Sequence, residues 1–261
     1  MSETYDTQNY IQYGQYQPYY INGFGIFNDA TTPNTLLDIG PGSCLDSTGS
    51  YQLSNNATIV INSAVNGLNG LDTGAIAASK VYAVYLVWDP VTLQTTGAMI
   101  SLNYTTPLMP FGYSAFLLIG YVTTDSSKNF LKGYWSAGNT AMRTFTYDTF
   151  QATAVTAGHA TSYTNVNLIT LVPNVANTPV QLYTSYVGAT AGNTLSLQAG
   201  NATGAQAIIT CQVATVHVTT ISTILAQPVS ITSVISPVIN YEQTNSSDSV
   251  AIDVAGYQWF V

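Results

Sequence analysis

Apolar residues along this chain fall in short runs separated by turn residues, and none of the runs has the 3.6-residue period of a good amphipathic helix. The runs 81–88 and 115–122 are apolar on both faces, which is typical of strands covered on both sides. Shorter runs at 58–61 and 130–135 predict further strands, and at most one helical turn is expected, around 73–80. Strands that recur roughly every ten residues between turn signals predict an all-β fold, an antiparallel β-sandwich or jelly roll.

Beyond a turn-rich segment at 136–139, apolar residues alternate with polar or small ones, as in strands with one face in a core. The inward positions are Val180 and Leu182, Leu195 and Leu197, and Val250, Ile252 and Val254. The change of pattern predicts two β-domains, at 36–138 and 139–261. One continuous sandwich over both ranges is the alternative.

The segment 208–221 changes its hydrophobic phase. Ile209, Cys211 and Val213 are odd-numbered apolar positions, whereas the apolar positions that follow are even-numbered, at Ala214, Val216 and Val218. One strand register cannot bury both sets, because successive side chains point to opposite faces. A β-bulge or sharp bend is therefore predicted near 213–214.

Residues 1–35 differ from the rest and predict an extended arm. Tyrosines recur there every third residue and are interleaved with Gln and Gly, a period that fits neither helix nor strand but suits a polyproline-like conformation. Tyrosine brings a large contact area at low entropy cost. The arm either stays disordered or orders against a partner or sister subunit. The candidate attachment residues are Tyr10, Tyr13, Tyr16, Tyr19 and Tyr20.

Uncharged side chains supply the polarity of this chain. Only 6% of its residues are charged, with 12 acids and four bases and a net charge of −8, whereas about a quarter is ordinary. The few scattered cations cannot displace the counterions of a nucleic acid or hold an anionic membrane. The polar, acidic start predicts no signal peptide, and no apolar run approaches the roughly 20 residues of a membrane span. This composition favours a building block or binding module over an enzyme.

One tripeptide copies an enzyme signature. Asp72-Thr73-Gly74 matches that of aspartic proteases, which need two adjacent carboxylates. The later Asp248 has no following Thr-Gly, so a turn is the favoured interpretation. Asn66, Asn69 and Asp72 could offer oxygens to Ca²⁺, but calcium usually takes several carboxylates. We therefore expect no catalytic residue, no cofactor and no metal site.

The remaining candidate residues are interpreted as structural. Cys44 and Cys211 lack the spacing of zinc or redox motifs, and two separate buried thiols are favoured over a disulfide. His159 and His217 have no partner acid or nucleophile in any motif. Asn-x-Ser/Thr sequons are expected by chance in so Asn- and Thr-rich a chain and are expected to be unused; they start at Asn56, Asn103, Asn201 and Asn245.

Three tryptophans, with 19 tyrosines, offer rings that could stack on sugars in a glycan-binding groove. Aromatic residues in β-proteins are more often core or interface residues. Both interpretations stay open for Trp88, Trp135 and Trp259, the possible glycan contacts.

Several segments, in order, resemble a family of tailed-bacteriophage virion proteins found as tail-fibre, head-fibre or capsid-decoration components. They are 42–53 (GSCLDSTGSYQL), 69–75 (NGLDTGA), 80–87 (KVYAVYLV), 110–113 (PFGY) and 119–125 (IGYVTTD), with a weaker echo at Tyr241 and 254–257. The resemblance covers about residues 40–125. The chain departs from the family pattern with Leu45 where Arg is expected, Lys80-Val81 where Trp-Tyr is expected, and Leu117-Leu118 where Arg is common.

The resemblance implies a non-enzymatic structural protein of a phage virion, made in the host cytoplasm and released by lysis. We expect a homotrimer, because a closed symmetric assembly buries neutral strand faces, docked on capsid or tail proteins through residues 1–35. The alternative is a receptor- or glycan-binding module at a fibre tip that meets host surface glycan. A hydrolase would need clustered carboxylates that no local pair supplies.

Overall fold

The computed structural model describes residues 20–260 except 92–95, 137–141, 149–151, 176–177, 200–207, 213–218 and 229–236. The described residues form strands and turns and no helix, which confirms the all-β prediction. The finer expectation of a sandwich or jelly roll stays a prediction. The strands are β1 (Ile21–Gly23), β2 (Ile26–Asn28), β3 (Leu36–Ile39), β4 (Gly42–Leu45), β5 (Gln52–Asn55), β6 (Ile59–Asn62), β7 (Gly70–Leu71), β8 (Val81–Trp88), β9 (Gly97–Ser101), β10 (Ala115–Thr123), β11 (Gly133–Trp135), β12 (Met142–Tyr147), β13 (Thr153–Gly158), β14 (Thr164–Asn167), β15 (Pro179–Val187), β16 (Thr194–Ala199), β17 (Ile208–Gln212), β18 (Thr219–Pro228), β19 (Val238–Gln243) and β20 (Ser249–Phe260).

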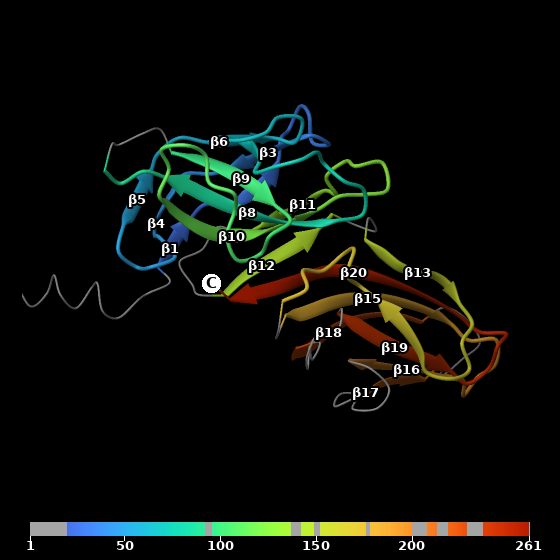
Figure 1. Cartoon of the computed structure of the whole chain (residues 1–261). Coiled ribbons are helices and arrows are strands. Elements are labelled where there is room, and N and C mark those ends of the chain that lie inside the picture. Colours follow the sequence, from blue (N-terminus) through green and yellow to red (C-terminus); the bar gives the residue numbers. More distant parts are fainter. Residues whose placement is uncertain are drawn as a thin grey trace, which may run out of the picture.

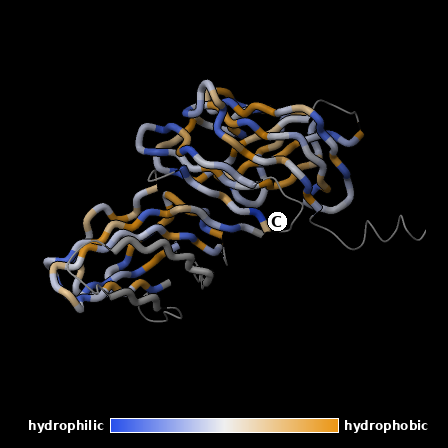
Figure 2. The backbone as a smooth tube through the Cα atoms, turned by 180° about the vertical axis from the view of Figure 1, so that it is seen from behind, coloured by the Kyte–Doolittle hydropathy of each residue, from blue (hydrophilic) through white to orange (hydrophobic). Residues whose placement is uncertain are grey.

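A nine-stranded sheet runs through the whole molecule (Figure 1). Its order is β18-β15-β20-β12-β11-β2-β3-β6, and β13 also pairs with β20. One end of this sheet, formed by β12-β11-β2-β3-β6, belongs to an N-terminal lobe (β1–β12). In this lobe the sheet β10-β8-β9-β7 packs against that end, beside the small sheet β1-β4-β5. The sheet β14-β19-β16-β17 belongs to a C-terminal lobe (β13–β20). Hydrophobic segments recur along the strands of both lobes (Figure 2).

The strands predicted from apolar runs are found at or near their expected positions. The run 81–88 forms β8, which is buried along its full length, and 115–122 lies within β10. The run 58–61 overlaps β6, whereas only the last three residues of 130–135 form a strand, β11. Residues 73–80 form turns without a helical turn. The inward-facing residues predicted in the second half of the chain are buried.

Residues 21–35 are part of the folded body, although they were expected in the arm. They contain β1 and β2, and β2 pairs with both β3 and β11. Ile21, Phe24 and Ile26 are fully buried. These apolar side chains gain more from burial than from an extended arm, so an arm extends no further than residue 20.

The predicted boundary at 138/139 falls within a continuous ladder. Strand β11 precedes this boundary and β12 follows it, yet they pair from Gly133↔Tyr147 to Trp135↔Phe145. Strand β12 in turn pairs with β20. Figure 1 shows the two lobes joined along this part of the sheet. The division into two domains stays a prediction.

Strand β20 changes its buried face in the middle. Its register with β15 shifts between Gln181 and Leu182, which leaves Ala255 as an extra residue. A bulge of this kind exchanges the inward and outward sets of side chains. The buried hydrophobic side chains accordingly pass from even to odd numbers, in the order Val250, Ile252, Val254, Tyr257 and Trp259. The bulge predicted at 213–214 lies outside the described residues.

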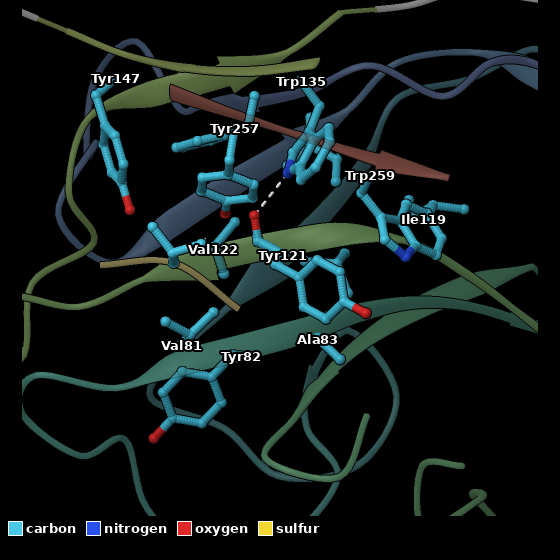
Figure 3. Close-up of a cluster of buried hydrophobic side chains, with 14 of the residues drawn as sticks. Val81, Tyr82, Ala83, Ile119, Tyr121, Val122, Trp135, Tyr147, Tyr257 and Trp259 are labelled. Carbon is cyan, nitrogen blue, oxygen red and sulfur yellow. Dashed lines mark hydrogen bonds between the residues drawn. The ribbon is translucent and has the colours of Figure 1, made fainter. Parts of the chain in front are cut away.

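An aromatic cluster joins the two layers of the N-terminal lobe (Figure 3). Trp135 of β11 contacts Phe145, Tyr257 and Trp259 with ring centroids 5.4, 5.5 and 6.4 Å apart. Trp259 meets Tyr121 of β10 edge-on at 5.5 Å. The last strand of the chain thus completes the core of the N-terminal lobe.

Candidate functional site

The candidate site is an open depression beside β7 and β9, which we call the Asp72 depression. It has a volume of about 730 Å³. Its walls come from the segment after β7, the end of β9 and the loop between β9 and β10. The lining residues are Leu71, Asp72, Thr73, Gly74, Ala75, Tyr82, Ser101, Leu102, Asn103, Thr106, Pro107 and Leu108.

The carboxylate of Asp72 holds two walls of this depression together. Its Oδ2 accepts hydrogen bonds from the Ser101 hydroxyl at 2.7 Å and from the Leu108 main-chain N–H at 3.0 Å. Its own N–H donates to the carbonyl oxygen of Ile100 at 2.9 Å. One carboxylate oxygen thus fixes a loop 36 residues further along the chain.

A compact turn forms the rim next to Asp72. The side-chain Oδ1 of Asn103 accepts hydrogen bonds from the N–H and hydroxyl of Thr105 and from the N–H of Thr106. The Tyr85 hydroxyl donates to the main-chain oxygen of Asn103 at 2.9 Å. Burial raises the pKa of the Tyr82 and Tyr85 phenols, and the charge of Asp72 raises both further, so these hydroxyls remain protonated at neutral pH.

The protease signature does not form a pair of carboxylates. Asp72 binds Ser101 and Leu108 in the N-terminal lobe. Asp248 is buried in the C-terminal lobe, where it accepts hydrogen bonds from the Tyr186 hydroxyl, the Ala189 N–H and the Asn193 amide, each at 2.7 Å. The two aspartates share no partner among the described residues, and each acts as a loop anchor.

The Asn66, Asn69 and Asp72 series also forms a turn. The Oδ1 of Asn69 accepts a hydrogen bond from the Ala98 N–H at 3.0 Å, and Asn69 itself has a positive φ of 63°. Within the described ranges, no group of three or more His, Cys, Asp or Glu side chains is placed to hold a metal ion.

The three tryptophans expected as possible glycan contacts lie in the core. The exposed fractions of Trp88, Trp135 and Trp259 are 3%, 0% and 8%. The indole N–H of Trp135 donates to the carbonyl oxygen of Tyr121 at 2.6 Å. These rings cannot stack on a sugar without leaving the core, so the structure favours their core interpretation.

Two exposed aromatic side chains lie next to each other on the outer face of the nine-stranded sheet. Phe27 and Tyr134 are 43% and 44% exposed, and their rings stack with centroids 6.5 Å apart. Cross-strand pairing places Asp38 between Phe27 and the exposed Val60. We call Val60, Asp38, Phe27 and Tyr134 the outer row. Burial, followed by the charge of Asp29, raises the pKa of Asp38.

Most of the attachment tyrosines, from Tyr10 to Tyr19, lie outside the described residues. Tyr20 is described. Its hydroxyl lies 2.9 Å from the Ser43 hydroxyl, and its carbonyl oxygen accepts the Leu45 N–H at 3.0 Å. Tyr20 is thus bound to β4 and belongs to the folded body.

Arg143 is a structural residue that the sequence did not reveal. It is 1% exposed, and its guanidinium donates to the carbonyl oxygens of Ile119 at 2.5 Å and Phe24 at 2.6 Å. Weaker contacts reach Gly23 and Ser136. Burial lowers its pKa to about 10, so it remains protonated at neutral pH. The only signal in the sequence was its alternation with Phe145 and Tyr147, which places Arg143 on the same strand face as these two aromatic residues.

The cysteine and histidine expectations have mixed outcomes. Cys44 is buried and forms no disulfide, and burial raises the pKa of its thiol to about 12, with a further contribution from Asp46. The side chain of Cys211 lies outside the described part. His159 Nδ1 lies 2.5 Å from the main-chain oxygen of Asp248, a structural contact, whereas His217 is not described.

No protein-family model matches the sequence, and no curated protein matches it. The described part of the chain has no helix that is long and apolar enough to cross a membrane.

Proposed function

We propose that this chain is a non-enzymatic structural protein of a bacteriophage particle, a decoration or fibre component that assembles as a homotrimer and docks through its N-terminal arm. The outer row is the observation that carries the proposal. Exposed, stacked aromatic side chains on rigid strands mark protein interaction surfaces. Asp38 is the one charged residue of the row, and its raised pKa lowers the cost of covering it.

The composition of the N-terminal arm supports its proposed role in docking. Residues 1–19 are rich in Tyr and Gln and hold only two acids, Glu3 and Asp6, and no base. Such a segment binds by aromatic contact and amide hydrogen bonds rather than by charge. The arm joins the folded body at Tyr20, which is hydrogen-bonded to β4. An arm bound to a neighbouring protein would therefore hold the folded body close to that protein.

Light scattering on the full chain tests the assembly. We expect about three times the chain mass of 27.8 kDa. Replacing Tyr134 by Ser should shift the mass toward one chain, whereas replacing Tyr51, which is 46% exposed outside the outer row, should not. A monomeric full chain would contradict the trimer.

Particle incorporation tests the function itself. Full-length protein should be found by mass spectrometry in purified phage particles. A chain lacking residues 1–19 should fold and be missing from them. The deletion must stop at residue 19, because Ile21, Phe24 and Ile26 belong to the core. Equal incorporation of the shortened chain would refute the role of the arm, and absence of the full chain from particles would refute the proposed function.

A second candidate function is a receptor- or glycan-binding module. One observation favours it, the Asp72 depression, which is open to solvent and bordered by exposed polar and aliphatic residues. The two functions are compatible in one chain, because the outer row and the depression are formed by different residues.

A further inference from the structure

We infer that the Asp72 depression is a binding site for an uncharged carbohydrate. This inference rests on the second candidate function and adds its location and the class of ligand. Four properties of the depression support it: its preorganised walls, the hydrogen-bonding groups it offers, its charge, and its aliphatic rim.

The walls are fixed before any ligand arrives. Asp72 Oδ2 links Ser101 and Leu108, and Asn103 Oδ1 closes its own turn through Thr105 and Thr106. A site whose loops are already ordered loses little conformational entropy on binding. This matters for sugars, whose contacts with protein are individually weak because water competes for the same hydrogen bonds.

The groups left for a ligand are complementary to hydroxyls. Asp72 Oδ1 and the side-chain NH₂ of Asn103 have no hydrogen-bond partner among the described residues. The first only accepts and the second only donates, while the hydroxyls of Thr73 and Thr106 do both. A sugar hydroxyl both donates and accepts, so adjacent hydroxyls on one ring can use a carboxylate oxygen and an amide N–H together.

The charge of the site selects against anions. Its described lining contains one carboxylate and no Lys, Arg or His. The chain as a whole carries −8. A phosphate, uronic acid or sialic acid would meet repulsion with no cation to offset it. An uncharged glycan meets no such cost.

The rim offers aliphatic surface. Leu102 and Leu108 are 54% and 63% exposed and border the depression. One face of many sugar rings presents C–H groups, which pack on aliphatic side chains. The volume of about 730 Å³ lies within the range of small-molecule sites, roughly 300–1,000 Å³.

An array of purified bacterial polysaccharides tests the inference on the full chain. Half of the array should carry uncharged repeating units, and half should contain uronic or sialic acids. We expect binding to a subset of the uncharged polysaccharides only. Binding to none of them, or a preference for the acidic ones, would overturn the inference.

Two variants locate the binding. Asp72→Asn keeps an oxygen for Ser101 and Leu108 but removes the charge, and should weaken binding at least about tenfold. Leu108→Ala keeps the main-chain N–H and removes rim surface, so it reports on the site even if Asp72→Asn disturbs the loop. Asp125→Asn is the matched control, since Asp125 anchors the N–H groups of Ser127 and Asn129 away from the depression.

Unchanged binding in both Asp72→Asn and Leu108→Ala would place the glycan site elsewhere. The same variants should enter phage particles normally, because neither changes the arm or the outer row. Loss of glycan binding with normal incorporation would separate this site from the structural role. Normal incorporation without any glycan binding by the parent chain would refute this inference alone.

Discussion

The indole of Trp135 covers Gly120 so closely that a β-carbon at residue 120 would lie 2.8 Å from two of its ring atoms. Gly120 also marks the point where β10 shifts register against β8. The absence of a side chain there lets the indole reach the carbonyl oxygen of Tyr121. This contact ties the two layers of the N-terminal lobe at the centre of the aromatic cluster (Figure 3).

Replacing Gly120 by Ala should therefore destabilise the fold. The indole is rigid and packed on all sides, so the added methyl group forces a main-chain or ring shift that costs about 1–3 kcal/mol. Urea unfolding followed by Trp fluorescence measures the loss. Gly40→Ala is the control, because a β-carbon there would have no neighbour closer than 3.8 Å. An equal effect of the two substitutions would contradict the packing argument.

Replacing Arg143 by Met should also destabilise the fold, although it removes a buried charge. The carbonyl oxygens of Ile119 and Phe24 would lose their donor inside the protein, at a cost of about 1–3 kcal/mol each. Urea unfolding measures the loss, with Lys80→Met as an exposed control expected to stay within about 0.5 kcal/mol. A more stable Arg143→Met variant would show that desolvation of the guanidinium outweighs these bonds.

The hydrophobic pattern of the sequence predicted those strands whose apolar residues follow one another directly along the chain. Strand β8 matches its apolar run at both ends, because eight successive apolar residues require cover on both faces. The bulge in β20 could have been predicted by the same reasoning applied to 208–221. Its apolar residues pass from Val254 to Tyr257, a change of phase that one register cannot bury.

The features that the sequence concealed depend on contacts between distant segments. Arg143 binds carbonyl groups at Phe24 and Ile119, and Asp72 binds Leu108, so no local spacing announces either arrangement. The sequence predicted that the folded body begins after residue 35, whereas it begins near residue 20, and the reason for this error is different. Tyr, Gly and Asn surround β1 and β2, and this composition concealed the buried residues Ile21 and Ile26.

The Cys44 thiol should be unreactive in the native protein. It is fully buried, and a pKa of about 12 leaves almost no thiolate at neutral pH. In a Cys211→Ser variant, Ellman's reagent should label no thiol until urea unfolds the chain, and then one. Rapid labelling of the native variant would show that β4 opens without global unfolding.

Asp248 and Asp38 should change stability with pH in opposite directions. Burial opposes ionisation of Asp248, but hydrogen bonds from Ala189, Tyr186 and Asn193 outweigh it and lower its pKa. Its carboxylate therefore contributes stability above its unfolded pKa of about 3.9, and this stability is lost as the pH falls through the lower folded value. The pKa of Asp38 is raised instead, so the stability linked to its protonated form is lost as the pH rises through its folded value.

Asparagine at each position separates the two effects. Asp248→Asn should lose about 1–3 kcal/mol at neutral pH, because the hydrogen bonds lose their charged acceptor, and the loss should shrink near pH 3. Asp38→Asn should slightly stabilise the chain at neutral pH, with a gain that vanishes in acid. Urea unfolding midpoints at several pH values measure both. An equal loss of stability by Asp248→Asn at every pH would contradict this explanation. The stabilisation would then come from the packing of Asn193 and Tyr186 around residue 248 and not from the ionised carboxylate.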